Sequence, residues 1–492
     1  MPVLSVNLNQ LSEHQITFES PTDHGPASLP VPNPTQSFWL DSSPDANPLG
    51  REGSDVPLTS DADVCIIGSG ISGVSAAYHL SKATEADPKL GPLKAVILEA
   101  RDFCSGATGR NGGHLVSNAF LEFGANKAVW GVEDAIRAVA LEDYTVSQIT
   151  TLVKTQNLTD AVDLVTGGRI HLLVTQKEIE EARADYIAAK GAGVDVSTSE
   201  WLSQEVVKER YGTSYPGYKL PGHNLWPSKL VTHLFYLAKR ATPSFDLRLH
   251  TRTPVTSILP NAFTSDSGMP SRRWILQTPR GFVSCSYVIH ATNAYASHLL
   301  PHLTGPHGIV PTRGQIIAIR ANATAAELTT SGWTGNEGFE YWFPRPLKAE
   351  DKDRHPLVIL GGGRENSKDR FEIDETDDSV VNEDVGKALR GFLPGVFPGK
   401  FAEGREPEME WTGIMGYTKT HDPFVGPLID SDSLNTSAYQ GQFISAGFSG
   451  HGMPRTFACA EAVAGMITAE LSHSQWEVPD WLPKHYLTTN RR

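Results

Sequence analysis

The most constraining feature of the sequence is a glycine-rich turn between an apolar run and a helical segment. Residues 64–68 read VCIIG, and the turn Gly68-Ser-Gly70-Ile-Ser-Gly73 opens the helical segment ISGVSAAYHLSK. In such a unit Gly68 allows the tight turn, Gly70 lets the backbone approach a pyrophosphate, and Gly73 permits close packing of helix on strand. Unpaired amides and the helix dipole then stabilise the phosphates. The pattern predicts a dinucleotide-binding unit.

The second strand of this unit is predicted at residues 95–100, AVILEA. Glu99 follows Gly73 by 26 residues (99 − 73), and its carboxylate can accept hydrogen bonds from a ribose hydroxyl. We attribute the long spacing to the loop at residues 84–93. An unpaired acid favours a ribose 2'-OH over a 2'-phosphate, although Arg101 is a weak signal in the other direction. The unit alone does not distinguish NAD from FAD.

Composition excludes several classes of protein. The 492-residue chain is long enough for two interwoven domains, and its net charge of −14 opposes binding to nucleic acid or anionic lipid. The four cysteines form no CxxC pair or Cys/His cluster, so we expect no disulfide and no metal site. No leader peptide and no eighteen-residue apolar run is evident, which predicts no membrane segment and a cytoplasmic location. Peroxisomal residence is the alternative, although TTNRR is not an SKL-type terminus.

Two polar regions are interpreted as non-catalytic. The first 60 residues are rich in Pro, Ser, Asn and Asp and predict an extended lead-in pinned by Trp39. Residues 369–384 are strongly acidic, which is typical of a solvated surface rather than a binding site.

Apolar periodicity predicts further elements. Helices are expected at residues 131–156, 176–190 and 455–471. Strands are expected at residues 169–174, 273–278, 286–291, 315–320, 357–361 and 442–446.

Two more glycine-rich segments favour flavin over nicotinamide. Residues 104–114 read CSGATGRNGGH, and residues 445–453 read SAGFSGHGM before the last helix. An NAD domain normally continues into another strand-helix repeat after the ribose acid, whereas a flavin enzyme leads the chain past the pyrophosphate towards the isoalloxazine. The positive end of the last helix can stabilise an anionic reduced flavin.

The chain resembles the D-amino-acid oxidase superfamily of FAD enzymes, in particular the branch of monomeric sarcosine oxidase and γ-glutamylputrescine oxidase. The resemblance rests on DVCIIGSGISGVSAAYHL, GATGRNGGH, VIHATNAYAS, PTRGQ, YTKTHDPFVGPL and SAGFSGHGM, which occur in the family's order between about residues 61 and 471.

The resemblance implies an α/β protein with a Rossmann-type FAD domain built from discontinuous segments and an α+β, mixed-sheet substrate domain. We assign residues 61–118, 225–300 and 405–472 to the FAD-binding domain and residues 119–224 and 301–404 to the substrate domain. Residues 1–60 form the lead-in and residues 473–492 a C-terminal tail.

The phosphate turn and the resemblance together imply a set of cofactor-binding residues. Val255 is expected on the adenine side, Ala291 and Thr292 over the dinucleotide, and the two later glycine-rich segments around the flavin ring. The full set is Gly68, Gly70, Ile71, Ser72, Gly73, Glu99, Ala100, Arg101, Ser105, Gly106, Ala107, Thr108, Asn111, Gly112, Gly113, His114, Val255, Ala291, Thr292, Gly447, Ser449, Gly450, His451, Gly452 and Met453.

Three positions depart from the sarcosine oxidase pattern. Met415 replaces the cysteine that carries covalent FAD, so we expect no cysteinyl link, which leaves His114 or His451 as the alternative attachment points. Pro454 replaces a lysine that holds the substrate carboxylate, with Arg313 or Arg345 as alternative anchors. Ile359 stands where a lysine assists oxygen reduction.

The implied activity is oxidation of a small amine or amino-acid-like substrate by FAD. A hydride equivalent passes from the α-carbon to flavin N5, the imine is hydrolysed, and O2 is reduced to H2O2. The alternatives are an FAD-dependent dehydrogenase with another electron acceptor and an NAD-linked dehydrogenase. The candidates for a catalytic or substrate-wall role are Tyr341, Trp342, Tyr417 and His451.

Overall fold

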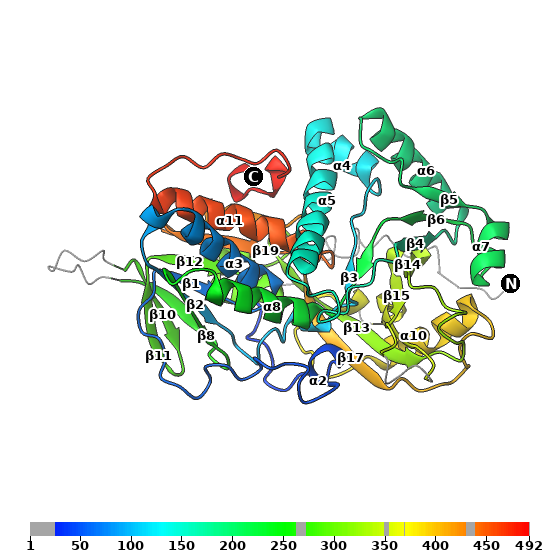
Figure 1. The fold of residues 1–492 in the computed structure, drawn as a ribbon, viewed down its shortest axis with the longest axis horizontal. Helices are drawn as coiled ribbons and strands as arrows, with labels where there is room; N and C mark the ends of the chain where they lie inside the picture. The colour runs from blue at the N-terminus through cyan, green and yellow to red at the C-terminus, as the bar shows by residue number, and fades with distance from the viewer. Residues whose placement is uncertain (1–24, 262–271, 349–353, 369, 430–437, 492) are drawn as a thin grey trace.

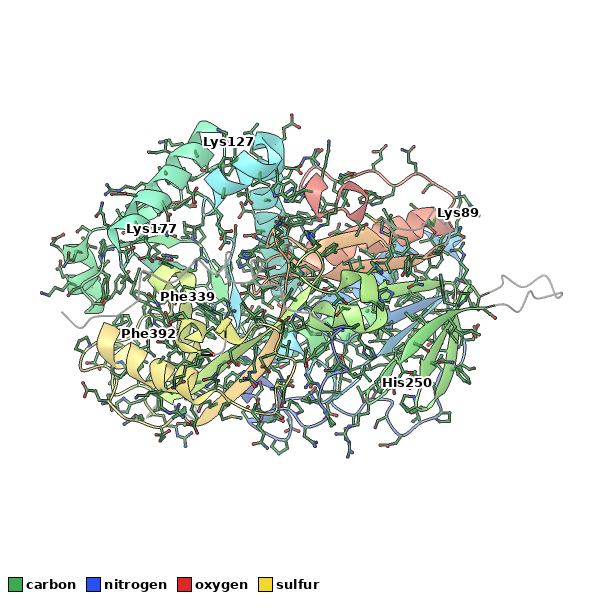
Figure 2. All side chains as sticks on the ribbon, turned by 180° about the vertical axis from the view of Figure 1, so that it is seen from behind. Lys89, Lys127, Lys177, His250, Phe339 and Phe392 are labelled. Carbon is green, nitrogen blue, oxygen red and sulfur yellow. The ribbon has the colours of Figure 1, made fainter. Side chains whose placement is uncertain are left out.

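Two large β-sheets organise the protein. The computed structural model describes residues 25–261, 272–348, 354–368, 370–429 and 438–491. One sheet, with its helices, fills one half of the molecule, and the second sheet lies in the other half (Figure 1). Seen from behind, Phe339 and Phe392 lie in the half of the second sheet and His250 in the half of the first (Figure 2).

The first sheet has six strands and a central parallel core. Its order is β18 (Phe424–Pro427), β19 (Gln442–Ala446), β12 (Tyr287–His290), β1 (Val64–Ile67), β2 (Leu93–Leu98) and β8 (Phe245–His250). Only the edge strand β18 runs antiparallel to its neighbour. The carboxyl ends of β1 and β2 therefore lie side by side, which brings the turn after β1 next to Glu99.

Both faces of this sheet are covered, which explains why its strands are apolar throughout. In β1, Val64 and Ile66 pack against helices, whereas Cys65 and Ile67 pack in a separate core. The helices are α3 (Ile71–Ala86), α8 (Pro227–Arg240) and α11 (Thr456–Leu471), which lie together in Figure 1. The opposite face is covered by the antiparallel strands β11 (Gly281–Cys285), β10 (Trp274–Thr278) and β9 (Ser257–Pro260).

The second sheet has eight mixed strands. Its order is β17 (Met409–Tyr417), β13 (Val310–Arg320), β16 (Leu357–Gly362), β15 (Glu340–Pro344), β14 (Gly332–Gly335), β4 (Arg169–Leu172), β6 (Gly217–Leu220) and β5 (Glu200–Leu202). One face packs Trp333 and Trp342 against Phe392 of α10 (Glu383–Val396). The predicted boundary at residue 405 assigns β17 to the FAD-binding segments, whereas its hydrogen bonds join it to β13.

The remaining α-helices and strands lie outside the two large sheets. They are α2 (Phe38–Asp41), the ribbon of β3 (His114–Leu115) and β7 (His223–Asn224), α4 (Phe123–Trp130), α5 (Val132–Thr155), α6 (Gln176–Gly191), α7 (Gln204–Tyr211) and α9 (Ala296–Leu299). Within the described ranges, no helix is both long and apolar enough to cross a bilayer. The predicted helices and strands are all present, although β13 begins at residue 310 instead of 315. Several other elements, among them α8, α10, β8 and β17, were not predicted.

The N-terminal lead-in is anchored where the prediction places it. The described part begins at residue 25, and the side chain of Trp39 is fully buried. The carbonyl of Trp39 accepts hydrogen bonds from Trp226 Nε1 and Ser228 Oγ, each at 2.8 Å. This part of the lead-in is therefore integral to the fold.

The acidic segment corrects the sequence-based interpretation, because two of its carboxylates are buried. Asp378 is fully buried and forms paired hydrogen bonds with Arg101, at 2.7 and 3.0 Å. Its Oδ2 also lies 3.6 Å from Arg110 Nε. Glu372, 3 % exposed, pairs with Arg313 at 2.5 Å. A count of charges does not reveal that arginines far away in the sequence approach these acids, so the prediction of a solvated surface is wrong for both.

Replacing Asp378 tests the contribution of this buried cluster. We expect Asp378→Asn to lower the free energy of unfolding by about 3 kcal/mol, because two buried guanidinium groups lose their carboxylate. Urea unfolding followed by circular dichroism measures the change. Asp246→Asn is the matched control, since the Asp246–Arg248 pair is about half exposed at 2.8 Å, and it should cost less than about 1 kcal/mol. Equal losses in the two variants would contradict the expectation.

Candidate functional site

The turn after β1 requires glycine for steric reasons. Gly68 has φ of 109°, and a Cβ there would lie 2.7 Å from Ala291 O. A Cβ at Gly73 would lie 2.0 Å from Gly68 O, so a side chain would push α3 away from the turn. Gly70 is the N-cap of α3 and provides no capping side chain. The first turn of α3 therefore has amides that can bind an anion.

Glu99 and Arg101 follow β2 beside this turn. Glu99 Oε2 accepts hydrogen bonds from the backbone and hydroxyl of Ser69, at 2.9 and 2.7 Å, and Oε1 accepts from Arg101 N at 3.0 Å. The guanidinium of Arg101 is paired with Asp378. Because its charge is already balanced, Arg101 is poorly suited to a ribose 2'-phosphate.

The glycine-rich loop at residues 104–114 is held from outside. Three successive carbonyls of this loop, at residues 109–111, each accept a side-chain hydrogen bond. The donors are Ser37 Oγ at 2.6 Å, Trp411 Nε1 at 2.9 Å and Trp39 Nε1 at 2.5 Å. Two of the three donors belong to the N-terminal lead-in, which therefore helps to position this loop.

The turn before α11 is also specialised. Gly447 and Gly450 have φ of 82° and 78°, a region that favours glycine. Asn293 Oδ1 accepts a hydrogen bond from Gly447 N at 3.0 Å, which ties this turn to the segment after β12.

Glu142, on α5, lies under the same turn. Its Oε1 accepts a hydrogen bond from Arg455 Nε at 2.8 Å and lies 3.2 Å from His451 Nε2, and its Oε2 accepts from Asn118 N at 2.6 Å. Burial raises the pKa of Glu142, but His451, Arg455 and these hydrogen bonds outweigh burial and lower the pKa to about 2. Glu142 is therefore an anion at neutral pH that orients His451 and Arg455.

The three turns converge on one cavity of about 680 Å³. Most of the cofactor-binding residues predicted from the sequence line this cavity. The exceptions are Gly73, Ser105 and Gly447, which act through packing and backbone geometry beside it. The lead-in also reaches the cavity, at Leu29 and Pro30.

The aromatic candidates separate in the structure. Tyr341 and Tyr417 line the cavity, whereas Trp342 is buried in the core against Trp333, with ring centroids 5.8 Å apart. Neighbouring residues of a strand point to opposite faces, so only one of Tyr341 and Trp342 can face the cavity. This corrects the prediction that Trp342 belongs to the substrate wall. The ring of Tyr341 occupies the space that a side chain at Gly112 or Gly361 would fill.

The cavity side of the second sheet presents one cross-strand row. Strand register aligns Ile316, Gly361, Tyr341, Thr334, His171 and Tyr218 across β13, β16, β15, β14, β4 and β6. All of them except Gly361 line the cavity. This surface is aromatic and weakly polar, which suits a small organic substrate.

His114 lies at the end of the loop at residues 104–114, here called the flavin loop, with both ring nitrogens near backbone oxygens. Nδ1 is 3.1 Å from Gly112 O and Nε2 is 3.3 Å from Trp342 O. Burial and the charge of Arg169 lower the pKa of His114 to about 4, so the ring is neutral at pH 7. A neutral ring carries one N–H, so only one of these carbonyls accepts a hydrogen bond at a time.

The predicted substrate anchors are engaged elsewhere. Arg313 pairs with Glu372, and Arg345 pairs with Asp163. Neither arginine lines the cavity, so the prediction that one of them replaces the missing lysine is wrong. The arginines that line the cavity are Arg101, Arg110, Arg169, Arg364 and Arg455. Sequence reasoning missed Arg169 and Arg364.

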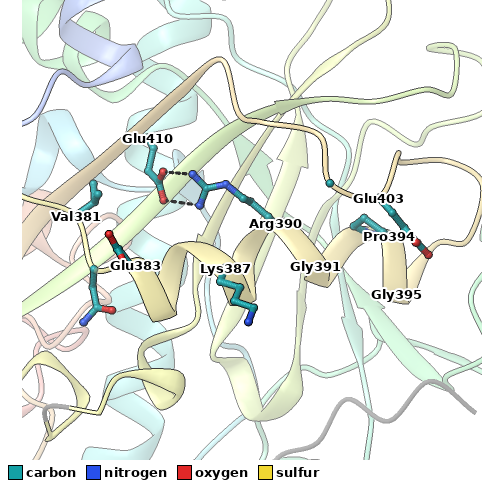
Figure 3. Close-up of a pocket in the computed structure, with 11 residues that line it drawn as sticks. Val381, Glu383, Lys387, Arg390, Gly391, Pro394, Gly395, Glu403 and Glu410 are labelled. Carbon is teal, nitrogen blue, oxygen red and sulfur yellow. Dashed lines mark hydrogen bonds and ion pairs between the residues drawn. The ribbon is translucent and has the colours of Figure 1, made fainter.

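A second hollow lies along α10, outside this site (Figure 3). Arg390 crosses it and forms hydrogen bonds with Glu410, at 2.6 and 3.3 Å. Lys387 and Gly391 are exposed there, and none of the glycine-rich turns contributes. The hollow is therefore a surface groove rather than part of the nucleotide site.

The family follows from comparison with known proteins. The family described as DAO, FAD dependent oxidoreductase, matches residues 63–466, which include all three turns. The chain belongs to this family. The NAD-linked alternative is therefore overturned, and the protein is an FAD-dependent oxidoreductase.

Individual relatives of this DAO-family chain are distant. Gamma-glutamylputrescine oxidoreductase of Escherichia coli (strain K12) is 25 % identical over 423 residues, 83 % of each chain. The L-amino acid deaminase of Proteus myxofaciens in complex with anthranilate has a TM-score of 0.65 at 15 % identity, covering 94 % of this chain and 98 % of that one. L-proline dehydrogenase of P. horikoshii has a TM-score of 0.63 at 18 % identity, covering 87 % and 98 %. These structures support the fold alone.

The site of this DAO-family chain suits FAD. The cavity runs without a break from the phosphate turn to the aromatic row. Ser72 Oγ and Thr292 Oγ1 are buried in its lining without a protein partner, as expected for groups that meet a polar ligand.

Gly73→Ala tests the phosphate turn. We expect the added methyl to displace α3 from Gly68, to reduce bound flavin severely and to lower the free energy of unfolding by about 1 to 3 kcal/mol. Flavin absorbance per mole of purified protein and urea unfolding measure the two effects. Gly391→Ala is the matched helical control, since a Cβ there meets nothing within 4 Å, and it should keep its flavin. Full flavin content in Gly73→Ala would contradict the expectation.

Glu142→Gln tests the anion under α11. The pKa of Glu142 in the folded protein, about 2, lies below the ordinary 4.5. The carboxylate therefore stabilises the fold above pH 4.5, and this contribution is lost as the pH falls towards 2. Between pH 4.5 and 2, we expect the free energy of unfolding to fall by about 3 kcal/mol more in wild type than in Glu142→Gln. Urea unfolding at several pH values measures this difference. Glu461→Gln is the control, because burial raises the pKa of the carboxyl that it removes. This variant should not reduce the loss of unfolding free energy that occurs as the pH falls from 4.5 to 2.

Proposed function

We propose that this chain is an oxidase of a small amine or amino-acid-like substrate. The observation that carries the proposal is the continuity of one cavity from the phosphate turn to the aromatic row of the second sheet. Bound FAD supplies the acceptor for a hydride equivalent from the substrate α-carbon. Water then hydrolyses the imine product, and O2 is reduced to H2O2.

The chain's own residues support oxidation of a neutral amine. Burial raises the pKa of Tyr341, although Arg364 partly opposes this, so the phenol stays protonated at neutral pH. Burial and Arg169 lower the pKa of His171 to about 3. The neutral side chains of Tyr341 and His171 therefore both face the cavity. They can orient a deprotonated amine through weak hydrogen bonds. Tyr417, whose hydroxyl accepts a hydrogen bond from Arg364 at 2.9 Å, completes the wall.

We propose that FAD is held without a covalent bond. Met415 lines the cavity where a cysteine would be needed, and a thioether is not an attachment point. His114 has backbone oxygens near both ring nitrogens, and His451 faces Glu142. These contacts favour histidines that position the site rather than bind the flavin covalently.

The environment of Ile359 bears on the choice between oxidase and dehydrogenase. Ile359 is fully buried in the core beside Phe343 and Trp411, and it does not line the cavity. A lysine for oxygen reduction would have to come from another position. The relatives include proteins named oxidase, dehydrogenase and deaminase, all for amines or amino acids. We propose the oxidase as first choice and an FAD dehydrogenase as second.

We further propose that the two sheets have different roles, one in binding the cofactor and the other in binding the substrate. The six-stranded sheet with residues 61–118, 225–300 and 418–472 holds the cofactor. The eight-stranded sheet, which includes β17, provides the substrate wall.

A panel of substrates tests this function. Holoprotein is mixed anaerobically with polyamines, N-methyl amino acids and amino acids, and flavin bleaching is recorded. We expect at least one class to bleach the flavin, and H2O2 to appear in equimolar amount when air is admitted. Acid precipitation of the same protein should release the flavin into the supernatant.

Each result has a separate meaning. Bleaching without peroxide on exposure to air would support the dehydrogenase. Flavin that stays in the acid precipitate would contradict non-covalent binding. Failure of every amine to bleach an intact flavin would contradict the proposed function, and the flavin-depleted Gly73→Ala protein serves as the background control.

A further inference from the structure

The N-terminal lead-in contributes to the cavity wall although it lies outside residues 63–466, which match the family. Leu29 and Pro30 line the cavity and are partly buried, yet neither belongs to a helix or a strand. Within the described part of the chain, residues 27–34 form no hydrogen bond between backbone groups. Side chains of other segments therefore have to hold this part of the wall.

Two hydrogen bonds hold the residues on either side of Leu29 and Pro30. Ala27 N donates to Ser297 Oγ of α9 at 2.9 Å. Four residues later, the carbonyl of Val31 accepts a hydrogen bond from Arg101 Nη1, beyond the end of β2, at 3.3 Å. The segment therefore passes from α9 to the carboxyl end of β2, beside the turn that is expected to bind the cofactor phosphates.

The far end of the segment is fixed by the buried cluster around Asp378. Thr35 N donates to the Asp378 carbonyl at 2.7 Å, and the Thr35 carbonyl accepts from Arg110 Nη2 at 2.7 Å. Ser28 Oγ also donates to Thr376 Oγ1 at 3.1 Å. The segment is therefore attached to α9, to the loop after β2 and to residues 376–378.

Proline stiffens the same segment. Pro30, Pro32 and Pro34 fix the backbone φ angle at alternate positions. A stiff segment loses less conformational entropy when it becomes ordered than a flexible one does. A few hydrogen bonds can therefore hold it in place, and it can open locally while both sheets stay folded.

Three polar atoms of residues 292–298 are buried next to this segment or close to it in sequence. Thr292 Oγ1, Tyr295 Oη and His298 Nε2 have no hydrogen-bond partner among the described residues, and all three residues line the cavity. The other ring nitrogen of His298, Nδ1, lies 3.2 Å from the Ala27 carbonyl. Burial raises the pKa of Tyr295, so its hydroxyl stays protonated and can donate. Since buried polar atoms normally have partners, these atoms indicate that a polar ligand binds beside the segment.

We propose that residues 27–35 form a strap that closes the cofactor site and retains FAD. Leu29 and Pro30 contact the bound cofactor, and FAD leaves only after the strap opens. This rests on the proposed function, in particular on non-covalent binding of FAD. The strap provides the retention that a covalent link would otherwise give.

The rate of FAD release tests the strap. Holoprotein is diluted, and the rise of free-flavin fluorescence gives the rate constant of release. We expect Leu29→Ala to release FAD about tenfold faster than wild type, because a side chain of the wall is lost. Val31→Ala is the matched control in the same segment, since Val31 does not line the cavity. It should change the rate by less than about twofold.

A second variant separates the strap from direct contact with the cofactor. Ser297 does not line the cavity, and its hydroxyl holds Ala27. We expect Ser297→Ala to release FAD about fivefold faster, because one anchor of the strap is lost. Hydrogen exchange measured by mass spectrometry should show faster exchange of residues 27–35 in Ser297→Ala and in wild type stripped of FAD.

The outcomes distinguish the strap from general stability and from the proposed function. Wild-type release rates in both Leu29→Ala and Ser297→Ala, or an equal rise in Val31→Ala, would overturn the strap. Faster release that accompanies a lower melting temperature of the flavin-stripped variants would also overturn it, as would flavin that stays in the acid precipitate. If amines still bleach the flavin in these cases, the proposed function stands while the strap fails. If release changes as expected and no amine bleaches the flavin, the strap stands while the proposed function fails.

Discussion

The buried carboxylate of Asp378 joins parts of the protein that would otherwise meet only through apolar packing. Arg101 follows the second strand of the nucleotide unit, Arg110 lies in the loop at residues 104–114, and both approach Asp378, which belongs to the half of the eight-stranded sheet. The Asp378 carbonyl accepts hydrogen bonds from the backbone and side chain of Thr35. A guanidinium and a carboxylate removed from water must pair closely to offset desolvation, so this cluster tolerates little change in geometry.

This constraint explains how the cavity is built at the seam between two sheets. The first sheet contributes the phosphate turn and the start of α11, and the second contributes the row containing Tyr341 and His171. The loop at residues 104–114 passes between them, and Ser37, Trp39 and Trp411 hold its carbonyls from outside. A cofactor bound there would contact both halves, which gives each half a role in positioning the reacting atoms.

The arginines that line the cavity differ in how their charges are balanced. Arg101, Arg110 and Arg455 are balanced by acids of the chain and act structurally. Arg169 has no such partner among the described residues, and its Nε and Nη2 atoms are buried without a hydrogen-bond partner. Pro454 and Arg169 both line the cavity.

The sequence by itself determined the features that depend on neighbouring residues. Gly68 and Gly73 are needed because a side chain at either position would clash within or beside the turn. The apolar runs of β1 and β2 indicate strands that are buried on both faces. The glycine-rich loops and their order were enough to indicate a flavin enzyme. Strand alternation in RIHLLV, where Arg169 and His171 share one face, was a signal for the missed arginine.

Only the tertiary structure decided which side chains face the cavity and which charges find partners. Tyr341 and Trp342 are adjacent and chemically alike, yet Tyr341 lines the cavity and Trp342 is buried in the core of the sheet. Only the position of the strand in the sheet decides which of the two faces the cavity. Asp378 belongs to an acidic run, yet it is buried because two distant arginines converge on it. Pairing across hundreds of residues depends on the path of the chain in space, and local sequence patterns carry no information about that path.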